Sequence, residues 1–165
     1  MRGFTLLETI IAIVIIEVGI IALTSLGVST LKQGRYIINE TIAANLAQEG
    51  LELVRNIRDT NTIAENNPWD KGINNINRGI ISYDNPVLSN ISSTSTDPIA
   101  CGDSCLIYKN TDGFYTHSGG TKTKFYRMIK VDHQSNKDTI TCQVGWIDYG
   151  KQHLITTITK LYDWQ

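Results

Sequence analysis

The sequence predicts an α+β protein in which a long N-terminal α-helix packs on a C-terminal antiparallel β-sheet. Three observations predict this class. An apolar run extends from Phe4 to Leu31, and a stretch with apolar residues at helical spacing follows it. The last third of the chain alternates apolar and polar residues in short segments between turn residues, which is the pattern of half-buried strands.

The apolar run contains no Lys, Arg, Asp, Pro or His, and its only charges are Glu8 and Glu17. A helix of this length would reach about 42 Å, whereas a bilayer core needs about 20 apolar residues. Its many Ile, Leu and Val residues outweigh a cost of about 3 kcal/mol for one carboxylate in the span. Segment 4–31 is therefore predicted to cross a lipid bilayer. Arg2 is the only charge before it, so the bulk of the chain is expected outside the cytoplasm.

The residues from Gly3 to Glu8 read Gly-Phe-Thr-Leu-Leu-Glu and stand directly before the apolar helix. This arrangement resembles the N-terminal signal of type IV pilins and type II secretion pseudopilins. The resemblance implies that residues 1–3 are a leader, that prepilin peptidase cuts between Gly3 and Phe4, and that Phe4 is then N-methylated. Thr5 and Glu8 take assembly positions, and the glutamate is expected to pair with the N-terminal amine of a neighbouring subunit.

Elementary electrostatics agrees with that expectation for Glu8. An unpaired ammonium or carboxylate in an apolar helix bundle costs several kcal/mol, and pairing the two relieves both charges. An ordinary signal anchor with an incidental glutamate is the alternative. It is disfavoured because ordinary secretory signals are cut after their apolar core, and here the plausible cut precedes it.

Glu17 lies nine residues after Glu8, or about 900° around the helix, and so falls on nearly the opposite face. The two carboxylates therefore cannot share one partner. Glu17 either makes a polar contact with a different subunit or is a protonated or snorkelling glutamate without a specific role. The contact hypothesis predicts that Glu17→Leu lowers filament number, and an unchanged filament count would refute it.

Segment 32–58 is predicted to continue the same helix as an amphipathic half, because no proline interrupts the chain from Phe4 to Arg58. Its expected apolar stripe is Ile38, Ile42, Leu46, Gly50, Leu53 or Val54, and Ile57. The other faces are assigned to Asn39, Glu40, Gln48, Glu49, Glu52 and Arg55. The places where a bend costs least are Gly19, Gly27 and Gly34. Pilins often carry a proline in the membrane half, and this chain has none there.

The remainder, 59–165, is predicted to form a globular head. Residues 59–100 are rich in Asn and punctuated by Pro68, Gly72 and Asn85-Pro86, which indicates a variable loop with one or two short turns or strands. Its Asp and Asn residues lack the spacing of an EF-hand, so a solvated loop is favoured over a calcium site.

An antiparallel sheet is predicted over about 106–165. Segments 106–108 and 114–116 flank Asp112-Gly113, a hairpin signal. Strands are then expected at 124–131, 139–147 and 154–164. With Arg127, Trp146 and Trp164, this tail resembles minor pilins of the pilin-V type and I-subunit pseudopilins, and the fold expected is the pilin fold. Arg127 shares a strand face with apolar residues, which favours a structural ion pair or aromatic stack.

Three cysteines are present. The Cys101–Cys105 pair is short enough for a local disulfide in an oxidising compartment, and this is favoured over free thiols. The third, Cys142, is expected to be a buried inert thiol because it shares a strand face with apolar residues.

The chain carries no enzyme signature, and we expect no catalytic residue, metal or cofactor. The spacing of His117, His133 and His153 does not fit a metal site, and surface positions are favoured for them. A net charge of −1 gives no basic face for nucleic acid. With 165 residues the chain has room for one modest head.

The function expected from the resemblance is a structural subunit, a minor pilin, of a type IV pilus-like filament. It would lie in the cytoplasmic (inner) membrane before joining an extracellular filament. The expected partners are other pilin subunits, prepilin peptidase and the inner-membrane assembly platform. The alternatives are a pseudopilin of a type II secretion or DNA-uptake (competence) system, and a membrane-anchored extracellular binding module that does not polymerise.

Overall fold

The computed structural model describes residues 5–64 and 68–163. The chain divides into two compact units, Met1–Asn39 and Glu40–Gln165, and the boundary falls inside the helix α1 (Leu6–Ile63). The predicted α+β class is confirmed: α1 is one long helix, and its C-terminal part packs on an antiparallel sheet of seven strands.

The helix begins after Thr5, which acts as its N-cap. The Thr5 carbonyl accepts the N–H groups of Glu8 and Thr9 at 3.0 and 3.2 Å, and the Thr5 hydroxyl accepts that of Glu8 at 3.4 Å. The predicted end at Arg58 is wrong, because α1 continues to Ile63. Residues 59–63 contain neither Gly nor Pro, and the Thr62 hydroxyl donates to the Arg58 carbonyl within the helix.

In the first unit, α1 is apolar around its whole circumference and exposed along its whole apolar length. Leu6 is 79% exposed and Leu31 is 72% exposed. The hydroxyls of Thr24 and Thr30 donate to helix carbonyls one turn earlier, at 2.9–3.0 Å, so they need no external partner. Among the described residues, α1 is the one helix long and apolar enough to cross a membrane.

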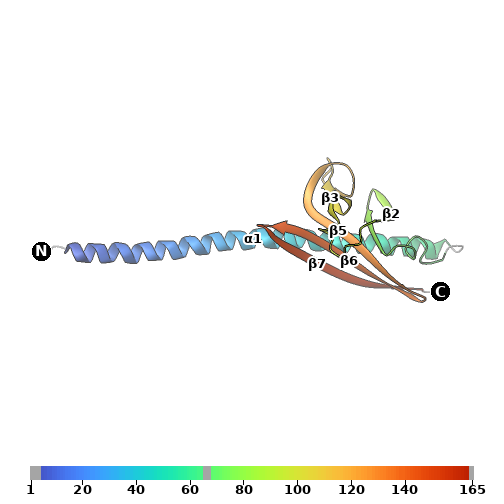
Figure 1. Cartoon of the computed structure of the whole chain (residues 1–165), viewed down its shortest axis with the longest axis horizontal. Coiled ribbons are helices and arrows are strands. Elements are labelled where there is room, and N and C mark those ends of the chain that lie inside the picture. Colours follow the sequence, from blue (N-terminus) through green and yellow to red (C-terminus); the bar gives the residue numbers. More distant parts are fainter. Residues whose placement is uncertain (1–4, 65–67, 164–165) are drawn as a thin grey trace. The chain divides into compact units, whose positions relative to one another are not determined.

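The second unit, Glu40–Gln165, is called the head from here on, and it contains the sheet (Figure 1). Its strands, among the described residues, are β1 (Arg78–Ser82), β2 (Asn85–Asn90), β3 (Leu106–Lys109), β4 (Tyr115–Thr116), β5 (Thr121–Gln134), β6 (Lys137–Asp148) and β7 (Lys151–Tyr162). The predicted hairpin is β3–β4, and the three predicted C-terminal strands correspond to β5, β6 and β7. Trp164, the expected end of the last strand, lies outside the described residues. The short strands predicted inside segment 59–100 are present as β1 and β2. They belong to this sheet, which therefore begins earlier than the predicted residue 106.

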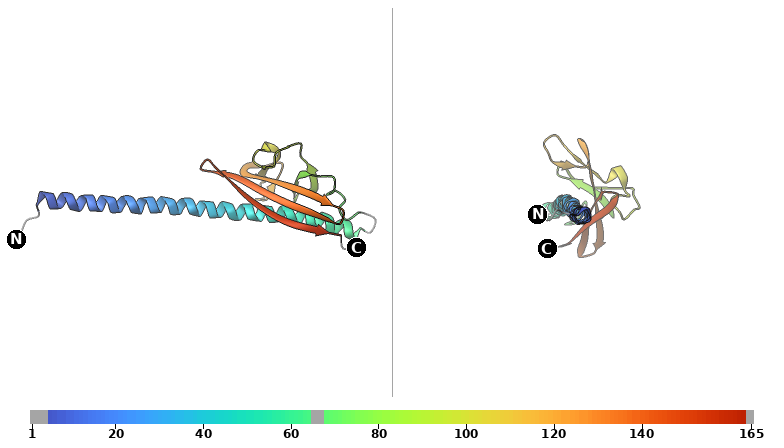
Figure 2. Two further views of the ribbon diagram at one scale, coloured as in Figure 1. Left: turned by 60° about the horizontal axis from the view of Figure 1, so that its bottom comes forward. Right: turned by 90° about the vertical axis from the view of Figure 1, so that its left-hand side faces the viewer.

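Strand β5 organises the sheet. Along one edge it pairs with β6 from Phe125 to Gln134. Along the other edge it pairs first with β3 and then, at Ile129 and Lys130, with β1. Strand β7 pairs with β6 over its full length and forms one edge of the sheet. Figures 1 and 2 show these long strands side by side against the C-terminal part of α1.

The core lies between residues 43–61 of α1 and the facing side of the sheet. Gly50 lies at a close approach of the helix to the sheet, because a Cβ at this position would lie 3.0 Å from the Cys142 sulfur and 3.3 Å from the Arg127 Cδ. On the strands, the core is formed by alternate residues that face the helix: Phe125, Arg127, Ile129 and Val131 on β5, and Ile140, Cys142, Val144 and Trp146 on β6.

The predicted helix stripe is only partly correct. Leu46, Gly50 and Val54 are buried as expected. However, Ile38 is 61% exposed, whereas Asn39, assigned to the polar face, is 7% exposed. Besides Asn39, the buried positions from here to the end of the helix are Ala43, Leu46, Ala47, Gly50, Leu51, Val54, Arg58 and Asn61. The prediction advanced mostly in steps of four, which drift around a helix of 3.6 residues per turn.

The opposite face of the sheet is covered by the segment that precedes β3. A Cβ at Gly145 of β6 would lie 2.8 Å from Ile99 and 3.3 Å from Pro98. This segment continues into the short 3-10 helix η1 (Gly102–Ser104).

Candidate functional site

The predicted processing residues, Gly3 and Phe4, lie outside the described residues. The predicted assembly residues Thr5 and Glu8 lie at the start of α1, where Thr5 caps the first turn and Glu8 is exposed. A carboxylate in the first turn is favourably placed toward the helix dipole. Glu17 is also exposed, within the apolar half of the same helix. Both acidic groups are therefore available to an external partner.

Arg127 is the polar centre of the head. Its side chain is 1% exposed, and its guanidinium donates to the Leu46 carbonyl of α1 at 3.0 Å and to the Ile81 carbonyl of β1. It also lies 3.4 Å from a carboxylate oxygen of Glu49 on α1. The structure therefore supports the ion pair predicted for Arg127, which ties β5 to the helix and to β1.

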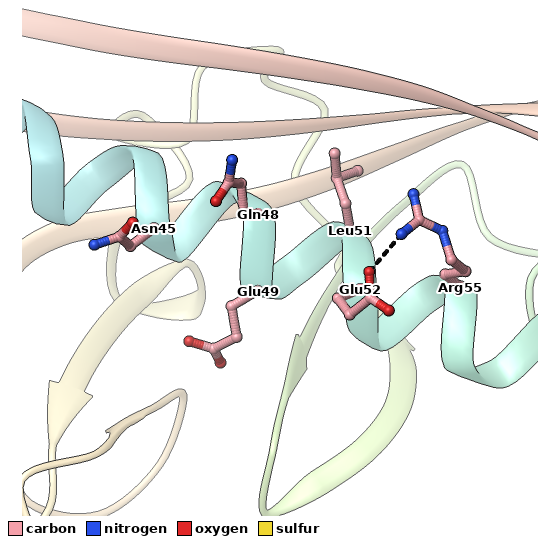
Figure 3. Close-up of a pocket in the computed structure, with 6 residues that line it drawn as sticks. All are labelled: Asn45, Gln48, Glu49, Leu51, Glu52 and Arg55. Carbon is pink, nitrogen blue, oxygen red and sulfur yellow. Dashed lines mark hydrogen bonds and ion pairs between the residues drawn. The ribbon is translucent and has the colours of Figure 1, made fainter.

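The outer surface of α1 in the head carries a polar hollow (Figure 3). All its lining residues come from the helix: Asn45, Gln48, Glu49, Leu51, Glu52 and Arg55. Glu52 and Arg55 form an ion pair on this surface, with side chains 68% and 41% exposed. The described residues that line the hollow include no His, Cys or Ser from which a nucleophile or metal site could be built.

Two of the three cysteines form a disulfide, and the third is a free thiol. Cys101 and Cys105 form a disulfide around η1. Cys142 is free and fully buried, and burial raises the pKa of its thiol to about 12. Since the thiolate is the reactive form, Cys142 is chemically inert in the folded head.

Surface positions were expected for the histidines, but two of them are largely covered. His153 lies within β7 and stacks on Trp146, with ring centroids 5.1 Å apart. His117 follows β4 and has Nδ1 at 3.2 Å from the Leu106 carbonyl. Burial, together with the positive charge of Arg127, lowers the pKa of His117 to about 3. His117 is therefore neutral at physiological pH.

His133, at the end of β5, lies beside two carboxylates. Its Nδ1 is 2.5 Å from Asp138 of β6 and 3.7 Å from Asp70 of the loop after α1. The ligand atoms of these three residues lie within 4.8 Å of one another, and they form the one such group among the described residues. Burial raises the pKa of Asp138, while the hydrogen bond with His133 opposes that rise.

Sequence reasoning missed this cluster. The hairpin between β5 and β6 carried a local signal, because a two-residue turn after Gln134 sets His133 opposite Asp138. Asp70 carried none, since it reaches the hairpin only through the path of the loop after α1. The partners of Arg127 were hidden for the same reason.

No protein-family profile, curated protein or solved structure matches this chain. The features that bear on function are therefore those of the chain itself: an exposed apolar helix with a carboxylate in its first turn, joined in the sequence to a folded α+β head.

Proposed function

We propose that this chain is a pilin-type filament subunit, a minor pilin, that is inserted in the cytoplasmic membrane, cleaved between Gly3 and Phe4 and assembled through the N-terminal half of α1. The observation that carries the proposal is the position of Glu8, a carboxylate in the first turn of an exposed apolar helix. In a helix used only as an anchor, Glu8 can do no more than favour the first turn through the helix dipole, whereas a helix that packs among copies can also pair it with a neighbour's N-terminal amine.

The exposure of the apolar half supports this proposal. A helix that is apolar on every side is stable only when surrounded by lipid or by other apolar surfaces. A membrane before assembly, and a bundle of like helices afterwards, would supply such surroundings in turn. The internally satisfied hydroxyls of Thr24 and Thr30 suit both environments.

The head supports the same role. Its contacts with α1 involve residues 43–61, and the apolar residues before Leu31 remain exposed. A subunit of this kind can therefore keep a folded head while its apolar segment exchanges lipid for other subunits. The same arrangement of apolar helix and folded head would serve a surface pilus and a secretion or competence pseudopilus alike.

The test compares Glu8→Gln with Glu40→Gln. Both remove one negative charge from an exposed position on α1, but Glu40 lies beyond the apolar segment. We expect Glu8→Gln to lower the amount of protein in sheared surface filaments at least tenfold while the amount in membranes is unchanged, because an ammonium would stay unpaired in the bundle. Glu40→Gln should assemble normally. Equal assembly of both variants would refute pairing through Glu8.

A further inference from the structure

The loop that follows α1 is held in place by a buried side chain of the helix itself. Asn61, in the last turn of α1, donates both of its amide hydrogens to carbonyls that flank Asp70, at 3.2 Å to Trp69 and 2.8 Å to Lys71. The Asp70 carbonyl in turn accepts the N–H groups of Ile73 and Asn74. These hydrogen bonds fix the backbone on both sides of Asp70 without the help of a ligand.

The other two members of the cluster are fixed by the β5–β6 hairpin. His133 and Asp138 are cross-strand partners one pair away from the turn, so their side chains lie on the same face of the sheet. Asp138 is fully buried, whereas the His133 side chain is 41% exposed. The cluster therefore has two buried carboxylates, from Asp70 and Asp138, and one imidazole at the edge of solvent.

One buried oxygen of this cluster is left without a partner in the described part of the chain. The second oxygen of Asp138 is buried and, among the residues that the structure describes, has no hydrogen-bond partner. A buried carboxylate oxygen without a partner is costly, and it points to a ligand that the protein chain alone does not supply.

We propose that Asp70, His133 and Asp138 bind one divalent transition-metal ion, with zinc as the best fit. One imidazole nitrogen and two carboxylate oxygens are three ligands that zinc accepts at about 2.0–2.2 Å, and a water molecule completes the tetrahedron. Around such an ion, neighbouring ligand atoms are roughly 3.3 Å apart. The 3.7 Å between His133 and Asp70 is near this spacing. The exposed His133 ring can turn so that the ion replaces its hydrogen bond with Asp138.

The ion would link elements that are distant in the sequence. It would join the loop after α1 to the tip of the β5–β6 hairpin, and so fasten one end of the helix to one end of the sheet. Ligands that bind only the folded state raise its stability in proportion to the logarithm of their concentration. Zinc is therefore expected to stabilise the head.

The test uses the full chain in detergent, stripped of metal with a chelator and titrated with zinc chloride in a calorimeter. We expect saturable binding of one zinc ion per chain and a rise of about 5 °C in the thermal unfolding midpoint of the head at saturation. His133→Gln and Asp70→Asn should each weaken binding at least tenfold. His133→Gln is the safer variant because its side chain is partly exposed, and its unfolding without zinc shows whether the head still folds.

Two controls match these variants in chemistry. Asp132→Asn removes an exposed carboxylate next to His133 on the opposite face of β5, and His153→Gln removes an imidazole from β7. Both should bind zinc as the unaltered chain does. The proposal is overturned if the unaltered chain shows no saturable binding at micromolar zinc, or if folded His133→Gln binds with unchanged affinity. Either result would leave the three residues as an ion-pair cluster only.

Discussion

The two halves of α1 have the same backbone conformation but differ in how their side chains are covered. In residues 6–31 the apolar side chains are exposed on every side. In residues 43–61 one face is buried against the sheet, with Ala43 and Val54 fully covered. The helix itself is a local property of both segments. Burial of the second half depends on strands that come much later in the chain, whereas the apolar side chains of the first half are exposed.

The largest effect in this comparison should come from the buried half. Replacing Arg127 with Met removes the guanidinium that joins β5 to α1 and β1, and leaves the Ile81 carbonyl without this donor. We expect a loss of about 3 kcal/mol in the free energy of unfolding, measured by urea denaturation of the head. Arg55→Met, which breaks an exposed ion pair on the same helix, should cost less than about 1 kcal/mol. Equal losses would show that the Arg127 network is not central to the head.

Substitution of glycines at a buried and an exposed position of α1 would test the difference in packing along the helix. A side chain at Gly50 would press on Cys142 and Arg127, whereas a Cβ at Gly34 would meet no atom within 4 Å. Gly50→Val is expected to destabilise the head by about 2 kcal/mol through overpacking. Gly34→Val should be neutral or slightly stabilising, since valine has the higher helix propensity. Thermal unfolding followed by near-ultraviolet circular dichroism would measure both. A destabilisation by Gly34→Val as large as that by Gly50→Val would contradict the described packing.

A smaller effect concerns pH and is confined to the head, because residues 5–39 contain no histidine. Folding lowers the pKa of His117 to about 3 from an ordinary value of 6.5, so below pH 6.5 the unfolded chain binds a proton that the folded head excludes. This contribution to stability is complete above pH 6.5 and is lost as the pH falls toward 3. His117→Asn should reduce the stability lost between about pH 7 and about pH 5.5 by about 1 kcal/mol. An unchanged pH dependence would show that His117 is protonated in the folded head.

Local patterns were sufficient for most of the fold. The absence of proline predicted one long helix, and the period of two, with Asp112-Gly113 as a turn, predicted the C-terminal strands. Patterns failed where the outcome depended on distant partners. The last turn of α1 is held by Asn61 bonding to the following loop, and β1 is recruited by pairing with β5. The composition of segment 59–100 allowed one or two short strands there, but it carries no signal for either of these contacts.

The candidate sites divide along the same line. The Cys101–Cys105 disulfide could be predicted because its two residues are close in the sequence, whereas the pairing of Glu8 stays a prediction. The contact of Arg127 with Glu49 and the grouping of Asp70 with His133 and Asp138 could not be predicted. Both bring together segments that are far apart in the sequence. For His133 the sequence predicted only a surface position. Its neighbours Asp138 and Asp70 are placed by strand register and by the path of a loop.

The central claim, that the N-terminal half of α1 is a processed assembly segment, is tested most directly by the intact mass and N-terminal sequence of protein recovered from sheared surface filaments. We predict a mature chain that begins at N-methylated Phe4, present in the sheared fraction in a smaller amount than the main filament subunit. A chain that retains Met1 and occurs only in membranes would contradict the proposal, and would leave a membrane-anchored head that does not polymerise.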